Sequence, residues 1–112
     1  MSYKVLIIDD SAVVRQTLTQ IYSSDPELEV VGTAPDAIIA LKKLSDLKPD
    51  VLSLDVQMPR MDGLTFLERL MKSNPMPVVM VSALTTKGSE EALRSLELGA
   101  IDIVEKPRLD VR

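Results

Sequence analysis

The stretch Val5-Leu6-Ile7-Ile8-Asp9-Asp10 decides the fold that the sequence predicts, because an unbroken apolar run ends abruptly in two acids. A short aliphatic run without polar alternation is typical of a central strand that is buried on both faces. The same pattern returns three times along the chain: residues 51–54 precede Asp55, residues 78–81 precede Ser82, and residues 101–104 lie just before Lys106. The sequence therefore predicts buried strands whose carboxyl ends carry polar side chains.

Helical patterns and turn formers separate these runs. Apolar residues recur at helical spacing over residues 11–24, 35–48, 64–71 and 90–98, and a further short strand is expected over residues 29–33. Pro26, Pro49 and Pro75 follow the first three helical stretches, and Gly99 suits the end of the fourth. This alternation predicts an α/β fold, a doubly wound sheet of five parallel strands with right-handed crossovers and helices on both faces.

A fifth helix should follow the last strand of such a sheet. Only residues 108–112 remain after Lys106-Pro107, and these make little more than one helical turn. We therefore expect residues 1–112 to form one domain that lacks most or all of its last helix. The strand surface that this helix would cover predicts self-association, a swapped element or reduced stability.

Composition excludes several classes of function. The net charge of −4 argues against nucleic acid as a partner, because no basic stripe could neutralise several phosphates. The absence of cysteine and histidine excludes disulfides, thiolate metal sites and Ser-His or Cys-His catalysis. No apolar stretch is long enough to insert into a membrane, and the amino terminus does not resemble a signal peptide. A cytoplasmic location is the default expectation.

The carboxyl edge of the predicted sheet is the place where open α/β sheets bind ligands. Asp10 and Asp55 are the best candidate metal ligands there, with Asp9 one step further out, where it would hold metal-bound water. The backbone carbonyl of Gln57 could complete the set. Because an all-oxygen site with few carboxylates and retained waters suits Mg²⁺ better than Ca²⁺, we expect Mg²⁺ as the cofactor.

Asp55 has a second possible role as a nucleophile that attacks phosphorus and forms an acyl phosphate. Lys106 would then supply a positive charge, and the Ser82 hydroxyl would hydrogen-bond a phosphoryl oxygen. Each residue alone also has a plain structural interpretation as a helix cap, a turn residue or a strand terminator. Their joint placement at strand ends favours the chemical interpretation.

These residues resemble the response-regulator receiver domain. The resemblance rests on Asp9-Asp10, Leu54-Asp55, Met58-Pro59-Arg60-Met61-Asp62-Gly63, Val81-Ser82-Ala83 and Lys106-Pro107. It implies a flavodoxin-like sheet in the order 2-1-3-4-5. It also implies that the phosphohistidine of a histidine kinase donates to Asp55, that Mg²⁺ binds at Asp9, Asp10 and Asp55, and that Ser82 and Lys106 sense the phosphoryl group. The domain would catalyse its own dephosphorylation.

A narrower likeness is to the regulatory domain of the chemotaxis protein-glutamate methylesterase family. It rests on Asp9-Asp10-Ser11-Ala12, Ala34-Pro35-Asp36, residues 76–82, residues 87–90, residues 96–102 and Lys106-Pro107. This resemblance implies a chemotaxis histidine kinase as the donor. It also implies a C-terminal methylesterase domain, absent here, which the receiver blocks until phosphorylation relieves the block.

One position departs from the receiver pattern. Many receivers carry Tyr or Phe three residues before the site lysine, and here that switch position is Ile103. A signal would then have to travel through Ser82, the following loop and the next helix. Two alternatives stay open at this stage: a Mg²⁺-dependent phosphohydrolase with an Asp nucleophile, and a pseudo-receiver that binds partners without taking phosphate.

Overall fold

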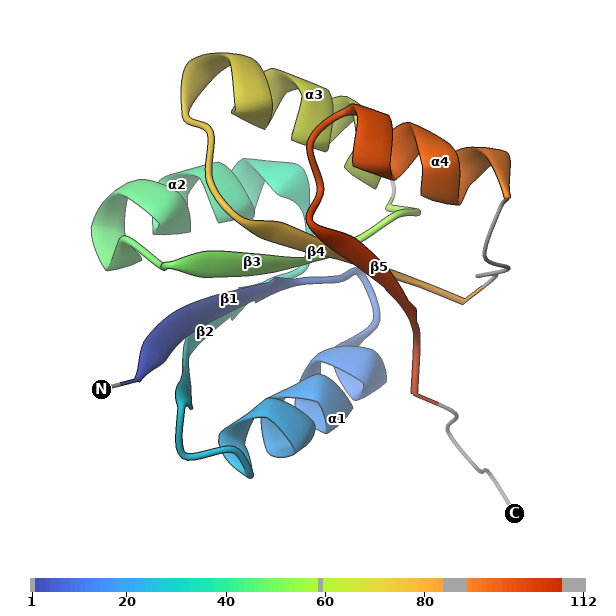
Figure 1. Cartoon of the computed structure of the whole chain (residues 1–112). Helices are drawn as coiled ribbons and strands as arrows, with labels where there is room; N and C mark the ends of the chain where they lie inside the picture. Colours follow the sequence, from blue (N-terminus) through green and yellow to red (C-terminus); the bar gives the residue numbers. More distant parts are fainter. Residues whose placement is uncertain (1, 59, 84–88, 108–112) are drawn as a thin grey trace.

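The computed structural model describes residues 2–58, 60–83 and 89–107. Strands and helices alternate along them as the sequence predicted (Figure 1). The strands are β1 (Tyr3–Ile8), β2 (Leu28–Ala34), β3 (Val51–Asp55), β4 (Val78–Ser82) and β5 (Asp102–Glu105). The helices are α1 (Ala12–Ser23), α2 (Ala37–Leu47), α3 (Gly63–Ser73) and α4 (Glu90–Glu97).

The strands form a single parallel sheet in the order β2-β1-β3-β4-β5. The predicted flavodoxin-like fold is therefore confirmed. Helix α1 covers one face of the sheet, and α2, α3 and α4 cover the other (Figure 1). Because all strands run the same way, the carboxyl ends of β1 and β3 meet near the middle of one edge.

Each helix starts at a side chain that accepts a hydrogen bond from its first turn. Ser11 caps α1, Asp36 caps α2, Asp62 caps α3 and Ser89 caps α4. The helix expected from Pro35 starts at Ala37 instead, because the Asp36 carboxylate accepts from the Ile39 amide at 2.9 Å. These caps satisfy amides that would otherwise lack partners, each contributing about 1 kcal/mol.

Two apolar cores hold the layers together. The larger lies under α2, α3 and α4 and includes the fully buried Leu6, Leu54, Phe66 and Met80. The smaller lies under α1 and consists of Val5, Ile7, Val14, Leu18 and Val81. Burial of each such side chain stabilises the fold by about 1.5–3 kcal/mol.

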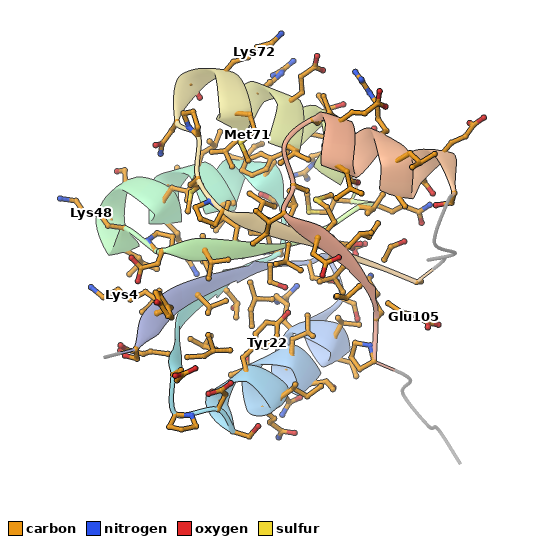
Figure 2. The ribbon with its side chains drawn as sticks, viewed as in Figure 1. Lys4, Tyr22, Lys48, Met71, Lys72 and Glu105 are labelled. Carbon is orange, nitrogen blue, oxygen red and sulfur yellow. The ribbon has the colours of Figure 1, made fainter. Side chains whose placement is uncertain are left out.

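Among the described residues, α1 is the helix on its face of the sheet, and it covers that face only in part (Figure 1). A groove of about 230 Å³ opens beside α1. Tyr22 lies between α1 and the sheet (Figure 2), and its hydroxyl shares a 2.8 Å hydrogen bond with Ser53 Oγ. The described residues end two positions after β5, so residues 108–112, where the last helix was expected to begin, lie outside them. The groove is lined by Val5, Tyr22, Leu28, Val51, Leu52, Ser53, Val79 and Val104.

The last strand starts one residue later than expected. Residues 101–104 were predicted, whereas β5 spans Asp102–Glu105, so Lys106 follows the strand directly. Gly99 has φ +111°, a conformation that favours glycine, and it ends the α4 segment as predicted. None of the helices in the described part of the chain has both the length and the apolar character needed to cross a membrane.

Candidate functional site

Four strand ends bring the predicted side chains to one edge of the sheet. Asp9 follows β1, Asp55 ends β3, Ser82 ends β4 and Lys106 follows β5. Asp9, Asp55 and Ser82 are buried, with 1%, 2% and 5% of their surface exposed. Buried polar groups are costly unless they are paired, so their position at this edge indicates a chemical role.

Three carboxylates form an acidic cluster at this edge. Asp9, Asp10 and Asp55 each offer an oxygen, and these oxygens all lie within 4.8 Å of one another. Asp10 is exposed, whereas Asp9 and Asp55 are buried. Asp9 is therefore the buried member of the Asp9-Asp10 pair, and Asp10 is the member that solvent reaches.

Lys106 links the two buried acids. Its Nζ donates a hydrogen bond to Asp55 Oδ2 at 3.1 Å and lies 3.2 Å from Asp9 Oδ2. The contact with Asp9 is an ion pair that lacks the geometry of a hydrogen bond. Among the described residues, Asp9 Oδ2 is the buried side-chain oxygen that lacks a hydrogen-bond partner. An oxygen in this state, beside two further carboxylates, fits a site for a hard divalent cation.

Both oxygens of Asp55 are held in place. Oδ1 accepts from the Gln57 amide at 3.1 Å, and Oδ2 accepts from Lys106. The Gln57 residue itself is exposed, and its main chain lies directly beside the acidic cluster. This arrangement points Asp55 in a fixed direction while its main chain stays part of β3.

Charge and burial shift the pKa values of the central pair. Burial, together with the negative charge of Asp9, raises the pKa of Asp55 from 3.8 to about 6, against the opposing effects of the Gln57 amide and Lys106. Burial alone would lower the pKa of Lys106, but its hydrogen bond to Asp55 and the charges of Asp55 and Asp9 outweigh burial and raise that pKa. The site thus holds more negative charge than it neutralises, which favours binding of a cation.

Ser82 and Lys106 are neighbours through the main chain as well. The Lys106 amide donates to the Ser82 carbonyl at 2.9 Å, continuing the β4–β5 pairing beyond Glu105. The side chain of Glu105 points outward (Figure 2), whereas the Lys106 side chain reaches the two buried acids. Ile103 is half-buried and packs against the larger core. Most of the loop expected to relay the signal, residues 84–88, lies outside the described residues.

Two residues that contact the acids were not predicted. Arg15 Nη1 donates to the Asp9 carbonyl at 2.6 Å, and Gly63 packs against the main chain of Asp55. The sequence feature that could have indicated the Arg15 contact is its position. Arg15 is a basic residue one helical turn after the capping residue Ser11, on a helix that directly follows two acids. The sequence indicated only turn chemistry for Gly63.

Comparisons with known proteins agree with this geometry. The chain matches the response regulator receiver domain over residues 5–111. It is 61% identical over 109 residues to the protein-glutamate methylesterase/protein-glutamine glutaminase 2 of Cupriavidus pinatubonensis, a match that covers 97% of this chain and 31% of that protein. The chain thus spans about a third of the length of the relatives that it matches.

Two solved structures are similar over almost the whole chain. The response regulator domain of CheB from Thermotoga maritima has 41% identity and a TM-score of 0.89, with 96% of this chain and 80% of that chain covered. A complex of the P1 domain of CheA3 with CheY6 from R. sphaeroides matches with 35% identity and a TM-score of 0.82, with 96% and 85% covered.

Proposed function

Because this chain belongs to the response regulator receiver domain family, a family of phosphorylation-regulated switches, we propose that Asp55 is the residue that takes up the phosphoryl group. The observation that supports this most is the setting of Asp55: buried at the end of β3, with one oxygen held by Lys106 and a second acid at contact distance of the same lysine. A carboxylate so placed has a fixed direction of attack.

The reaction is a transfer between a phosphohistidine and a carboxylate. An Asp55 oxygen forms a bond to phosphorus while the phosphorus–nitrogen bond breaks, and the electron pair of that bond returns to the imidazole. Lys106 then exchanges its contact with the carboxylate for one with a phosphoryl oxygen, and the Ser82 hydroxyl donates to another. Both contacts differ between the two states, which is what a switch requires.

The acidic cluster is proposed as the Mg²⁺ site. Asp9, Asp10 and Asp55, with the main-chain carbonyl of Gln57, would hold the ion. Asp9 Oδ2, which pairs with Lys106 but accepts no hydrogen bond, supports this assignment. When bound, the ion offsets the repulsion between the carboxylates and the incoming phosphoryl group. A phosphohydrolase is less well supported, because such enzymes usually carry a second acid at the position of Gln57.

The relatives support a proposal for the partners and the cellular location. The donor is proposed to be a chemotaxis histidine kinase, because a similar receiver is solved in complex with the P1 domain of CheA3. The regulated element is a methylesterase domain that follows in a longer protein, because the matched relatives bear that name and are about three times as long. Phosphorylation of Asp55 would relieve the block on that domain, in the cytoplasm.

The test is labelling with radioactive acetyl phosphate in the presence of Mg²⁺. Asp55→Asn should abolish labelling because the nucleophilic oxygen is replaced by an amide. Asp62→Asn is the matched control: it removes the same charge from an exposed helix cap, where Asn serves as well as Asp. Labelling of the Asp55→Asn protein at the normal level would refute the assignment. A wild-type protein that shows neither labelling nor any response to Mg²⁺ with beryllofluoride would identify a pseudo-receiver.

A further inference from the structure

Arg15 lies on α1, outside the acidic cluster, yet its side chain contacts the main chain that carries two of the acids. Arg15 Nη1 donates to the carbonyl oxygen of Asp9 at 2.6 Å. The residue is half-buried. A hydrogen bond from a charged donor in a partly buried place is stronger than a neutral one, so this contact holds the carbonyl firmly.

Asp9 is fixed at its other polar atoms as well. Its amide donates to the Ala34 carbonyl at 3.0 Å, and its Oδ1 accepts from the Ser11 amide at 2.9 Å. Oδ2 faces Lys106. With the carbonyl held by Arg15, Asp9 is attached to β2, to the start of α1 and to the end of β5.

The main chain of Arg15 is held within the first turns of α1. Its amide donates to the Ser11 carbonyl at 2.9 Å, and its carbonyl accepts from Thr19 Oγ1 at 2.7 Å. The guanidinium therefore projects from a helical turn whose capping residue, Ser11, also binds the Asp9 carboxylate. The helix and the acidic turn form one hydrogen-bonded unit.

The consequence concerns Asp10. The peptide unit is planar, so the Asp9 carbonyl lies in one plane with the nitrogen and Cα of Asp10. A fixed Asp9 carbonyl thus fixes where the Asp10 side chain begins. Asp10 is exposed, and its side chain has few neighbours to orient it by packing.

We propose that Arg15 is a positioning residue for cation binding: by holding the Asp9 carbonyl, it aims the Asp10 carboxylate at the ion shared with Asp9 and Asp55. This inference rests on the proposed Mg²⁺ site. It assigns no contact between Arg15 and the ion.

The direction in which Mg²⁺ affinity changes when Arg15 is removed distinguishes the positioning role from a simple effect of its charge. A guanidinium close to the acids repels a divalent cation, so its charge alone weakens Mg²⁺ binding, and removing it would tighten binding. If Arg15 acts by positioning, its removal should weaken Mg²⁺ binding, because loss of the contact frees the Asp9-Asp10 peptide. A merely structural role would lower the thermal stability and leave the Mg²⁺ affinity unchanged.

The test compares Arg15→Met, which keeps the apolar stem, with Arg15→Lys, which keeps a charged donor. Arg69→Met is the matched control, because it removes the same charge from an exposed residue of α3 on the other face of the sheet (Figure 1). Mg²⁺ affinity is measured by calorimetry. The Ser11 amide resonance, measured by NMR without metal, reports the acidic turn directly.

Arg15→Met should weaken Mg²⁺ binding by about tenfold, as is typical when a residue that orients a metal ligand is lost. It should also shift the Ser11 amide resonance. Arg15→Lys should keep most of the wild-type Mg²⁺ affinity, and Arg69→Met should bind Mg²⁺ as tightly as the wild type. Should Arg15→Met fail to fold, Arg15→Gln takes its place with the same expectation.

Unchanged or tighter Mg²⁺ binding in Arg15→Met would overturn the role of Arg15 and leave the proposed function standing. If the wild-type protein itself bound no Mg²⁺, the metal site and the positioning role would fall together. The Asp55 labelling experiment, which is independent of Arg15, distinguishes the two failures.

Discussion

Gly63 lies directly against the main chain of Asp55. A Cβ built on Gly63 would stand 2.0 Å from the Asp55 carbonyl oxygen, and the Gly63 amide donates to the Val56 carbonyl at 2.7 Å. The first residue of α3 is therefore packed on the end of β3, where the proposed nucleophile is attached. Only a residue without a side chain fits this approach.

Replacement of Gly63 by alanine should destabilise the protein. Alanine is the better helix former, by about 1 kcal/mol. The overlap with the Asp55 carbonyl is with backbone, which cannot swing aside as a side chain can, so α3 or the end of β3 must shift. We expect a net loss of about 1–3 kcal/mol in urea unfolding, as for other overpacked sites.

Gly32→Ala provides the control for that substitution. The Cβ added there would meet Leu47 Cδ1 at 2.7 Å, and this atom is the end of a flexible side chain. The loss of stability in urea unfolding should therefore be smaller for Gly32→Ala than for Gly63→Ala. Equal stability of Gly63→Ala and the wild type would show that the packing of α3 on Asp55 is not tight.

The raised pKa of Asp55 predicts how stability depends on pH without metal. Asp55 titrates near 3.8 in the unfolded chain and at about 6 in the folded protein. The folded state thus binds this proton more tightly, so Asp55 makes the protein less stable as the pH rises from about 4 through about 6. The upper limit is about 3 kcal/mol, since a tenfold difference in proton affinity is worth about 1.4 kcal/mol.

Asp55→Asn removes this dependence. In the presence of EDTA, the variant should be more stable than the wild type at pH 8, and the difference should disappear near pH 4. Urea unfolding across this pH range measures it, with Asp62→Asn as the control for loss of one charge. A variant that is less stable than the wild type at pH 8 would mean that the contact with Lys106 outweighs burial and the repulsion by Asp9.

Lys106→Met should separate metal binding from the response to the phosphoryl group. Without the ammonium, Asp9 and Asp55 keep their repulsion and lose their shared partner, so the pKa of Asp55 should rise further above 6. Metal-free stability at pH 8 should fall by roughly 2 kcal/mol, the cost of leaving buried charges unpaired. The loss should shrink at pH 5, where Asp55 becomes protonated.

Mg²⁺ should still bind the Lys106→Met protein, because the three carboxylates remain. The rise in melting temperature on adding beryllofluoride with Mg²⁺ should be much reduced, since Lys106 is proposed to bind the phosphoryl oxygens. Lys72→Met is the control, because that side chain is 77% exposed and pairs with Glu68. A normal beryllofluoride response in Lys106→Met would exclude the lysine from phosphoryl sensing.

Much of the fold could be predicted because each element is marked locally. The apolar run before Asp9 and the breakers at Pro49 and Pro75 fix strand and helix positions without knowledge of distant contacts. The parallel arrangement then brings Asp55 and Lys106 to one edge as a matter of topology.

Contacts between segments could not be predicted in the same way. Which of Asp9 and Asp10 is buried depends on pairing with β2, because the Asp9 amide donates to the Ala34 carbonyl and so extends the strand by one residue. The reach of Arg15 back to Asp9 and the approach of Gly63 to Asp55 depend on how helices start above the sheet. Sequence spacing alone carries no such information.

The apolar groove that the described residues form beside α1 predicts concentration-dependent self-association. Its walls are almost wholly apolar, and the one polar pair, Tyr22 and Ser53, is satisfied internally. Val104 is one of the lining residues and is 40% exposed. Exposed apolar surface of this kind favours contact with a second copy of the same surface. Sedimentation velocity should therefore show a growing dimer fraction between micromolar and millimolar concentration.

Val104→Lys should shift this equilibrium toward the monomer, because pairing two copies would bury a charge at the groove. Val13→Lys is the control: Val13 is 56% exposed on α1 and does not line the groove, so the same charge there should leave association unchanged. A protein that stays monomeric up to millimolar concentration would contradict the prediction. If both substitutions weakened self-association equally, either the contact would lie on another surface or the weakening would be a general effect of net charge.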